Sequence, residues 1–103
     1  MSGLDPVVHP PARLQIMAVL AEVQEAEFAL LRQTTSVSDS VLSKHLSALG
    51  EADYVKLRKA SVDGRVRTWA SITRAGRAAF KNHVAELRRL ADAAASVERI
   101  AAE

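Results

Sequence analysis

Small hydroxyl side chains and basic side chains stand close together in the middle of the sequence. Serines recur at short spacing between residues 36 and 47, with one lysine among them, and lysines and arginines cluster between residues 56 and 67. Small hydroxyl side chains let a backbone approach closely and hydrogen-bond to bases or phosphates, and cations pair with phosphates. This pattern indicates contact with a nucleic acid. The residues expected to make it are Ser40, Ser43, Lys44, Ser47, Arg58, Arg65 and Arg67.

Each half of this pattern also has a purely structural explanation. A serine and lysine face on a helix is often simply solvated, and a hairpin often carries solubilising charges on its exposed edge. Asp63, at the predicted hairpin tip, counts against phosphate contact because a carboxylate and a phosphate repel each other. The two halves side by side favour nucleic-acid binding over either structural explanation.

Catalytic and metal-binding groups are scarce. The chain has no cysteine, which excludes thiolate metal sites and cysteine nucleophiles. His9, His45 and His83 lack the i, i+4 spacing of a helical metal pair, and a site built from all three stays only an alternative. His45 lies at the edge of an apolar helix face, which is typical of a packed, hydrogen-bonded histidine. We therefore expect no enzyme activity, no catalytic residue, no cofactor and no metal.

Charge is unevenly distributed along the 103 residues. Lysine and arginine total 14 against 12 acidic residues, which suits one soluble domain. Residues 1–31 carry a net −3, residues 32–81 a net +6 and residues 82–103 a net −1. We interpret the small acidic cluster near the end of the first helix as solvated; it consists of Glu22, Glu25 and Glu27. No segment resembles a membrane span or a signal peptide, which predicts a cytoplasmic location and no membrane partner.

Apolar spacing predicts three helices in the first half of the chain. Prolines open a helix over residues 11–23, and a two-turn helix ending near residue 35 follows, preceded by a very short strand. Ser38 is a good N-cap for a helix over residues 39–52, which carries the small polar and basic side chains on one face. The opposite, buried face consists of Leu42, Leu46 and Leu49.

A hairpin follows these helices. Residues 55–72 alternate as two strands around Asp63-Gly64, which is a strong hairpin-turn dipeptide. The alternation places Val55 and Leu57 on the inward face.

The chain then continues as a long helix. Thr73 is its cap, and the helix over about residues 74–100 is roughly 40 Å long at about 1.5 Å per residue. A domain of this size cannot cover such a helix, so part of it is expected to pack on a second copy of the chain. The residues expected to form this dimer contact are Val84, Leu87, Ala91 and Ala94.

This order of elements is that of a winged helix-turn-helix domain. In that fold the third helix enters the DNA major groove, and the hairpin, called the wing, flanks it. The predicted fold class is therefore mainly α with a small β-hairpin (α+β), as a single DNA-binding domain over residues 1–103 with an extended C-terminal helix.

Three segments in order add a family resemblance. LSKHLSALGEADYV and DGRVRTWASITRAGRAAF, with the opening LDPVVHPPARLQIMAVLA, resemble winged-helix regulators related to the MarR and ArsR families, particularly their short single-domain members. The similarity covers most of residues 4–90. It implies a homodimeric transcriptional regulator, usually a repressor, that binds a palindromic operator in double-stranded DNA.

The resemblance also adds two residues to the expected DNA contacts, and the chain differs from the family pattern at some positions. By position it places recognition-helix contacts on Ser38 and Asp39 as well. Family members commonly have glycine where this chain has Asp53, so either the aspartate takes a left-handed conformation there at some cost or the helix ends differently. The cysteine metal sites of arsenical repressors are absent. A small-molecule effector stays an open alternative that no residue of the chain indicates.

A second hypothesis is that the chain has the winged-helix fold but does not bind DNA. A winged-helix scaffold can serve as a protein-interaction module, because a fold does not fix a function. The net charge of only +2, and Asp39 in the first turn of the polar-faced helix, favour this hypothesis slightly. It predicts no salt-dependent affinity for duplex DNA.

Overall fold

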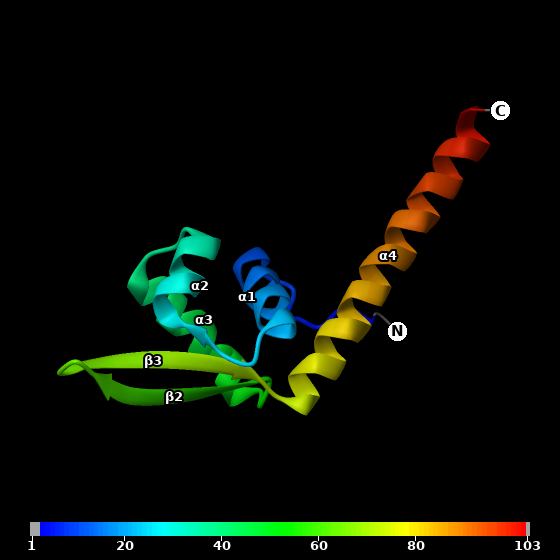
Figure 1. Ribbon diagram of the computed structural model, residues 1–103. Coiled ribbons are helices and arrows are strands. Elements are labelled where there is room, and N and C mark those ends of the chain that lie inside the picture. Colours follow the sequence, from blue (N-terminus) through cyan, green and yellow to red (C-terminus); the bar gives the residue numbers. More distant parts are fainter. Residues whose placement is uncertain (1–2, 103) are drawn as a thin grey trace.

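The computed structural model describes residues 3–102, which form four helices and three strands. In chain order these are α1 (Pro11–Glu22), β1 (Ala26–Glu27), α2 (Phe28–Thr35), α3 (Asp39–Glu51), β2 (Val55–Val62), β3 (Arg65–Ile72) and α4 (Arg74–Ala102). Helices α1, α2 and α3 gather on one side of the hairpin, and α4 leaves them obliquely (Figure 1). The predicted winged helix-turn-helix fold is confirmed, including the very short strand before α2. Within residues 3–102 no helix is long and apolar enough to cross a membrane.

One apolar core joins the helices to the base of the hairpin. Helix α1 contributes Ile16, Met17 and Leu20, which are fully buried. Side chains from α2 and α3 meet them from the other side, and these are Leu31, Leu42, Leu46 and Leu49. The core therefore holds α3 by one face and leaves the opposite face to solvent.

Local backbone conformations close the turns at both ends of α3. Ser36 takes a left-handed conformation (φ 57°), and its N–H closes the last turn of α2. Ser38 caps α3 as predicted, because its hydroxyl accepts a backbone N–H of the first turn at 3.3 Å. Helix α3 ends at Glu51, one residue earlier than predicted, and Asp53 takes a left-handed conformation with φ 61°.

The sheet is antiparallel with the strand order β1-β3-β2, which makes β2 an outer strand. Asp63 and Gly64 both have positive φ (51° and 78°), as in the two-residue turn whose twist matches that of paired strands. Val55 is buried as predicted, and Leu57 lies on the predicted inward side beside Leu46 of α3, but its side chain is still 44% exposed. Because β2 is an edge of the sheet and the core reaches only the base of the hairpin, strand alternation does not bury this position.

Helix α4 begins against the backbone that links α3 to β2. Thr73 caps it as predicted, since its hydroxyl accepts the N–H of Gly76 at 2.9 Å. The N–H of Thr73 donates to the carbonyl oxygen of Tyr54 at 3.0 Å. Gly76 is buried over the same carbonyl group, so the first turn of α4 approaches this backbone as closely as a residue without a side chain allows.

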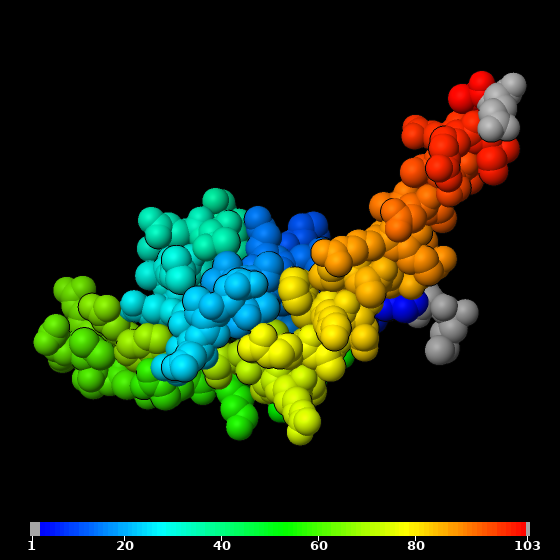
Figure 2. Space-filling view, turned by 45° about the vertical axis from the view of Figure 1, so that its right-hand side comes forward, coloured from blue at the N-terminus to red at the C-terminus, as the bar shows by residue number. Residues whose placement is uncertain are grey.

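The second half of α4 projects beyond the body. The molecule extends 66 Å along its longest axis and 25 and 21 Å across it, and Figure 2 shows the last turns of α4 standing clear of the other elements. Leu90, Val97 and Ile100 in this part are 41%, 66% and 71% exposed. The predicted long C-terminal helix is confirmed, and its outer part carries exposed apolar side chains.

A pair of histidines ties the N-terminal segment to α4. His83 is fully buried, and its Nδ1 accepts the backbone N–H of Asp5 at 2.9 Å. A neutral imidazole has a single N–H, so the proton lies on Nε2 of His83, which donates to Nδ1 of His9 at 3.2 Å. The Asp5 carboxylate also accepts a hydrogen bond from the Tyr54 hydroxyl at 2.6 Å. These bonds connect the N-terminal segment both to α4 and to the start of β2.

Because His83 is buried, we expect the protein to lose stability in mild acid. Burial holds the pKa of His83 below its ordinary value of 6.5, and His9 lowers it further while Asp5 opposes the shift. Below about pH 6.5 the unfolded chain therefore binds a proton that the folded chain resists, so the free energy of unfolding should fall as the pH decreases. Urea unfolding at about pH 7.5 and about pH 5.5 measures this loss. A His83→Gln variant should lose less stability on acidification, and equal stability of the wild type at both pH values would contradict the prediction.

Candidate nucleic-acid interface

The outer face of α3 presents the predicted contact residues to solvent. Ser40, Ser43, Lys44 and Ser47 are all exposed, while the leucines of the opposite face are buried. In the described part of the chain, the ammonium group of Lys44 has no ion-pair partner. A helix face that is small, polar and positively charged fits the major groove of B-DNA, which admits one α-helix.

Ser38 and Asp39 lie at the N-terminal end of this face. The Asp39 carboxylate pairs with the guanidinium group of Arg32 on α2 at 3.2 Å. The Ser38 hydroxyl lies 3.3 Å from that of Ser40. The contact with Arg32 offsets part of the negative charge that would repel a phosphate here, although an exposed pair of this kind is weak.

Helix α3 and the hairpin meet in a shallow corner of about 190 Å³. Ser43 and Ser47 line it from α3, and Lys59 and Thr68 line it from the strands. Sequence reasoning left Lys59 out of the contact set, although it lies an even number of residues from Val55 and so must share the α3 side of the sheet. The structure thus adds a cation to the predicted site, beside the serines of α3.

Arg58 and Arg67 lie on the other face of the hairpin, with Trp69 between β1 and β2. Arg58 stacks over the Trp69 ring, 4.4 Å from its centroid, and donates two hydrogen bonds to the Glu25 carboxylate at 2.9 and 2.8 Å. Arg67 donates to the Glu27 carboxylate at 3.1 Å. The structure therefore places these two predicted contact residues in ion pairs, and Arg67 also borders a hollow that Ser43 of α3 lines.

The same ion pairs correct the interpretation of the acidic cluster. Glu25 and Glu27 are not simply a solvated helix end, because each accepts a hydrogen bond from an arginine of the hairpin. The hydrogen bonds from Arg58 are the main cause that holds the pKa of Glu25 below its ordinary value of 4.5, so its carboxylate is charged at neutral pH. No sequence pattern predicts this pairing, because more than 30 residues separate the partners.

Arg65 lies at the tip of the hairpin. It is exposed beside the turn, and among residues 3–102 it has no ion-pair partner. Its neighbour Val66 is 74% exposed, which shows that the body does not reach the tip. The turn therefore projects a charged guanidinium group into solvent.

Metal binding finds no support in the described residues, which hold no cluster of three or more histidine, cysteine, aspartate or glutamate side chains suited to an ion. His45 is partly buried, and its Nδ1 accepts a hydrogen bond from Nε of Arg13 at 3.0 Å. Burial is the main cause that holds the pKa of His45 below its ordinary value of 6.5, and the charge of Arg13 adds to the effect. The predicted packed, hydrogen-bonded role of His45 is confirmed.

Known proteins resemble this chain in sequence or in fold. An uncharacterized protein of Methanocaldococcus jannaschii is 37% identical over 84 residues, which are 82% of this chain and 91% of that protein. The solved structure of a transcriptional regulator homologue from Pyrococcus horikoshii has a TM-score of 0.77 and 28% identity, over 84% of this chain and 86% of the other. The YusO protein of Bacillus subtilis has the same fold, with a TM-score of 0.74 and 20% identity over 84% of this chain and 61% of its own.

A family described as a winged helix DNA-binding domain matches residues 12–91, a range that contains α3 and the whole hairpin. The chain therefore belongs to the winged helix DNA-binding domain family and is, as predicted, not an enzyme.

Proposed function

We propose that this protein is a homodimeric transcriptional regulator related to the MarR and ArsR families, which places α3 in the DNA major groove and the hairpin beside it as a wing. The observation that carries the proposal is the exposed serine and lysine face of α3, which one buried core holds next to a projecting basic hairpin. Membership in a family of DNA-binding domains and the similarity to a protein described as a transcriptional regulator homologue support it.

The exposed cations position the protein on DNA in this proposal. Lys44, Lys59 and Arg65 contact phosphates or groove edges, and the serines of α3 make close or water-mediated contacts with base edges. Ser38 and Asp39 lie at the end of α3 that approaches the backbone of the duplex. The remaining predicted contacts, Arg58 and Arg67, reach a phosphate only after their ion pairs open.

The projecting end of α4 is the proposed dimer contact. Of the predicted set, Ala91 and Ala94 are exposed, while Val84 and Leu87 are partly covered by the body. The apolar surface continues outward through three further side chains, which are Leu90, Val97 and Ile100.

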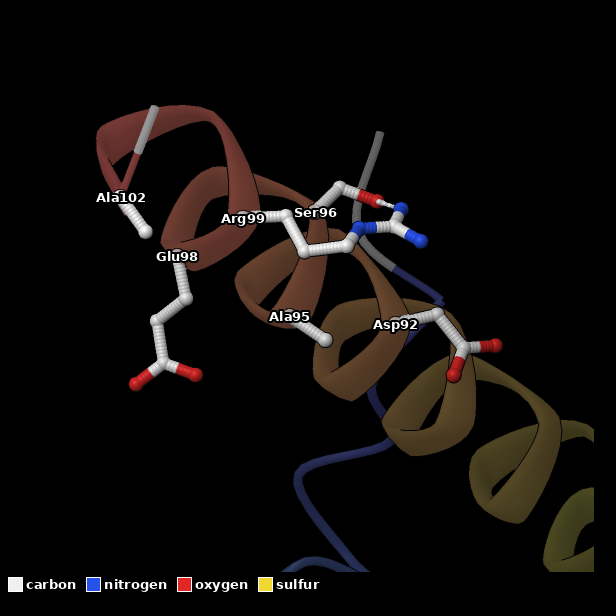
Figure 3. A pocket seen from close by; sticks show the side chains of 6 residues that line it. All are labelled: Asp92, Ala95, Ser96, Glu98, Arg99 and Ala102. Carbon is white, nitrogen blue, oxygen red and sulfur yellow. Dashed lines mark hydrogen bonds between the residues drawn. The ribbon is translucent and has the colours of Figure 1, made fainter.

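A polar side of the same turns makes this end amphipathic. Figure 3 shows Asp92, Ser96 and Arg99 along the helix, where the guanidinium group of Arg99 donates to the Ser96 hydroxyl at 3.2 Å. With about 3.6 residues per turn, Asp92 and Arg99 lie on the side away from Val97, and Ser96 lies between them and Ile100, which follows it by one helical turn. A helix end with one apolar and one polar side is suited to pairing with a second copy.

Such a pair would present two α3 helices to two half-sites. A two-fold symmetric dimer binds a palindromic site, with half-sites about 34 Å apart when one DNA turn separates them. Occupation of such a site within a promoter excludes the polymerase, so repression in the cytoplasm is the proposed output.

Fluorescence anisotropy tests the proposed function. Duplexes enriched from a random library by the protein are compared with a shuffled duplex of the same composition, from about 50 to about 200 mM salt. We expect tighter binding to the enriched duplex and a steep loss of affinity with salt, because each phosphate contact releases counterions. Failure to bind any duplex at about 50 mM salt would overturn the proposal.

Lys44→Ala is the first variant to measure. If Lys44 contacts a guanine, the variant should bind the enriched duplex about 1–3 kcal/mol more weakly and lose discrimination at one position. If it contacts a phosphate, both duplexes should be affected equally and the salt slope should become shallower by about one. Lys81→Ala removes the same charge from α4 and is the matched control. Equal affinities of Lys44→Ala and Lys81→Ala would show that Lys44 does not contact the DNA.

A protein-interaction module is the second candidate function. The observation that favours it is the pairing of Arg32, Arg58 and Arg67 with carboxylates, which reduces the positive charge offered to DNA. This candidate predicts that neither duplex binds in a salt-dependent way.

A further inference from the structure

One face of the hairpin carries a row of basic side chains. In the register of β2 and β3, Arg58 lies opposite Trp69 and Arg67 lies opposite Ala60. Directly paired residues point to the same side of an antiparallel sheet, and alternate residues along one strand share that side. The basic residues that share the face turned away from α3 are Lys56, Arg58, Arg65 and Arg67.

Two carboxylates from outside the hairpin occupy the middle of this row. Glu27 belongs to β1, which pairs with β3, and Glu25 lies in the link just before it. Glu25 accepts two hydrogen bonds from Arg58, and Glu27 accepts one from Arg67. Arg58 is held further by its stacking on Trp69.

These ion pairs decide how readily the hairpin binds a phosphate. A phosphate reaches Arg58 or Arg67 only by displacing a carboxylate of like charge. An exposed ion pair is weak, so a close and well-aligned phosphate can displace the carboxylate. A phosphate that is only in loose, transient contact interacts too weakly with the arginine to displace the carboxylate.

We propose that Glu25 and Glu27 are specificity-determining residues, which withhold Arg58 and Arg67 from DNA until α3 is seated in its preferred site. Non-specific binding depends almost wholly on phosphate contacts, whereas specific binding adds contacts with base edges. Keeping two arginines paired therefore weakens non-specific binding more than specific binding. This inference rests on the proposed DNA-binding function.

Carboxylate-to-amide substitutions test the inference. Glu25→Gln and Glu27→Gln keep the side-chain shape and remove one negative charge each. Glu22→Gln is the matched control, because Glu22 belongs to the same acidic cluster and has no ion-pair partner within residues 3–102. Anisotropy is measured on the shuffled and the enriched duplex across the salt series described above, after circular dichroism has shown that each variant is folded.

The expected result is a change in salt dependence that is confined to non-specific binding. On the shuffled duplex, the slope of log affinity against log salt should become steeper by about 0.9 for each arginine released, and Glu22→Gln should match the wild type. Between about 50 and 200 mM salt this is roughly a threefold larger change in affinity for each arginine. On the enriched duplex the slope should stay unchanged, since both arginines are already in use there.

Two outcomes would overturn the inference and leave the proposed function standing. One is an equal slope for Glu25→Gln and Glu22→Gln on the shuffled duplex while the wild type still prefers the enriched one. The other is a loss of affinity in Glu25→Gln or Glu27→Gln, which would make the ion pairs braces for the wing. Absence of duplex binding by the wild type would overturn the proposed function itself, and this inference with it.

Discussion

Replacing Gly76 with alanine should destabilise the protein more than any other single methyl group added to it. Gly76 is buried in the first turn of α4, and a Cβ at this position would collide with the carbonyl oxygen of Tyr54 and lie 2.9 Å from its Cα. Both partners are backbone atoms, so no side-chain rotation relieves the overlap. The first turn of α4 would have to move away from the link between α3 and β2.

The expected cost is at the upper end of the overpacking range, about 3 kcal/mol. For a domain of this size that corresponds to a fall in melting temperature of roughly 12–24 °C. Thermal unfolding followed by circular dichroism measures it.

Gly50→Ala provides the matched control. Gly50 lies within α3, and a Cβ built on it has no other atom within 4 Å beyond its chain neighbours and its own helix. The same substitution should therefore raise stability here by about 0.4–1 kcal/mol, because alanine restricts the unfolded chain. Equal melting temperatures for the two variants would show that the close approach of α4 to Tyr54 does not constrain the fold.

Short-range patterns explain why so much of the fold was predictable. The caps at Ser38 and Thr73, the Asp63-Gly64 turn and the leucine spacing of α3 each act within a few residues, and the structure shows all of them. The order of the elements then leaves few ways to build one core. Leu57 shows the limit, because alternation predicts its side of the sheet but not how far the core extends along the strand.

Long-range charge pairing is the part of the site that the sequence conceals. Arg58 and Arg67 look like free cations of the wing until β1 places Glu25 and Glu27 beside them. The bond between His9 and His83 is equally hidden, since it depends on how the N-terminal segment passes α4. Lys59, in contrast, could have been placed beside α3 by counting along the strand.

Placing glutamates on the apolar side of the projecting helix should separate the proposed dimer. Val97 and Ile100 are 66% and 71% exposed in the single chain, so Val97→Glu together with Ile100→Glu should leave the fold of each copy intact. Burying one such aliphatic side chain contributes about 1.5–3 kcal/mol, and a symmetric contact loses the contribution from both copies. The carboxylates would in addition be forced together without partners. The double variant should therefore be a monomer at micromolar concentration where the wild type is a dimer. Analytical ultracentrifugation measures this change in mass.

The same double variant should lose at least about 100-fold in affinity for an enriched duplex with two half-sites. In a dimer, once one α3 helix is bound, the second is held close to its half-site, which raises the overall affinity. A monomer loses this gain in affinity although it keeps every residue of α3 and the wing. Affinity for a single half-site should be unchanged, which separates loss of the dimer from damage to the interface. Arg99→Glu makes the same change of two charges on the side of these turns that lies away from Val97, and it should leave both the dimer and its affinity near the wild-type values. If the double variant stays dimeric and binds like the wild type, the exposed end of α4 is not where two copies meet.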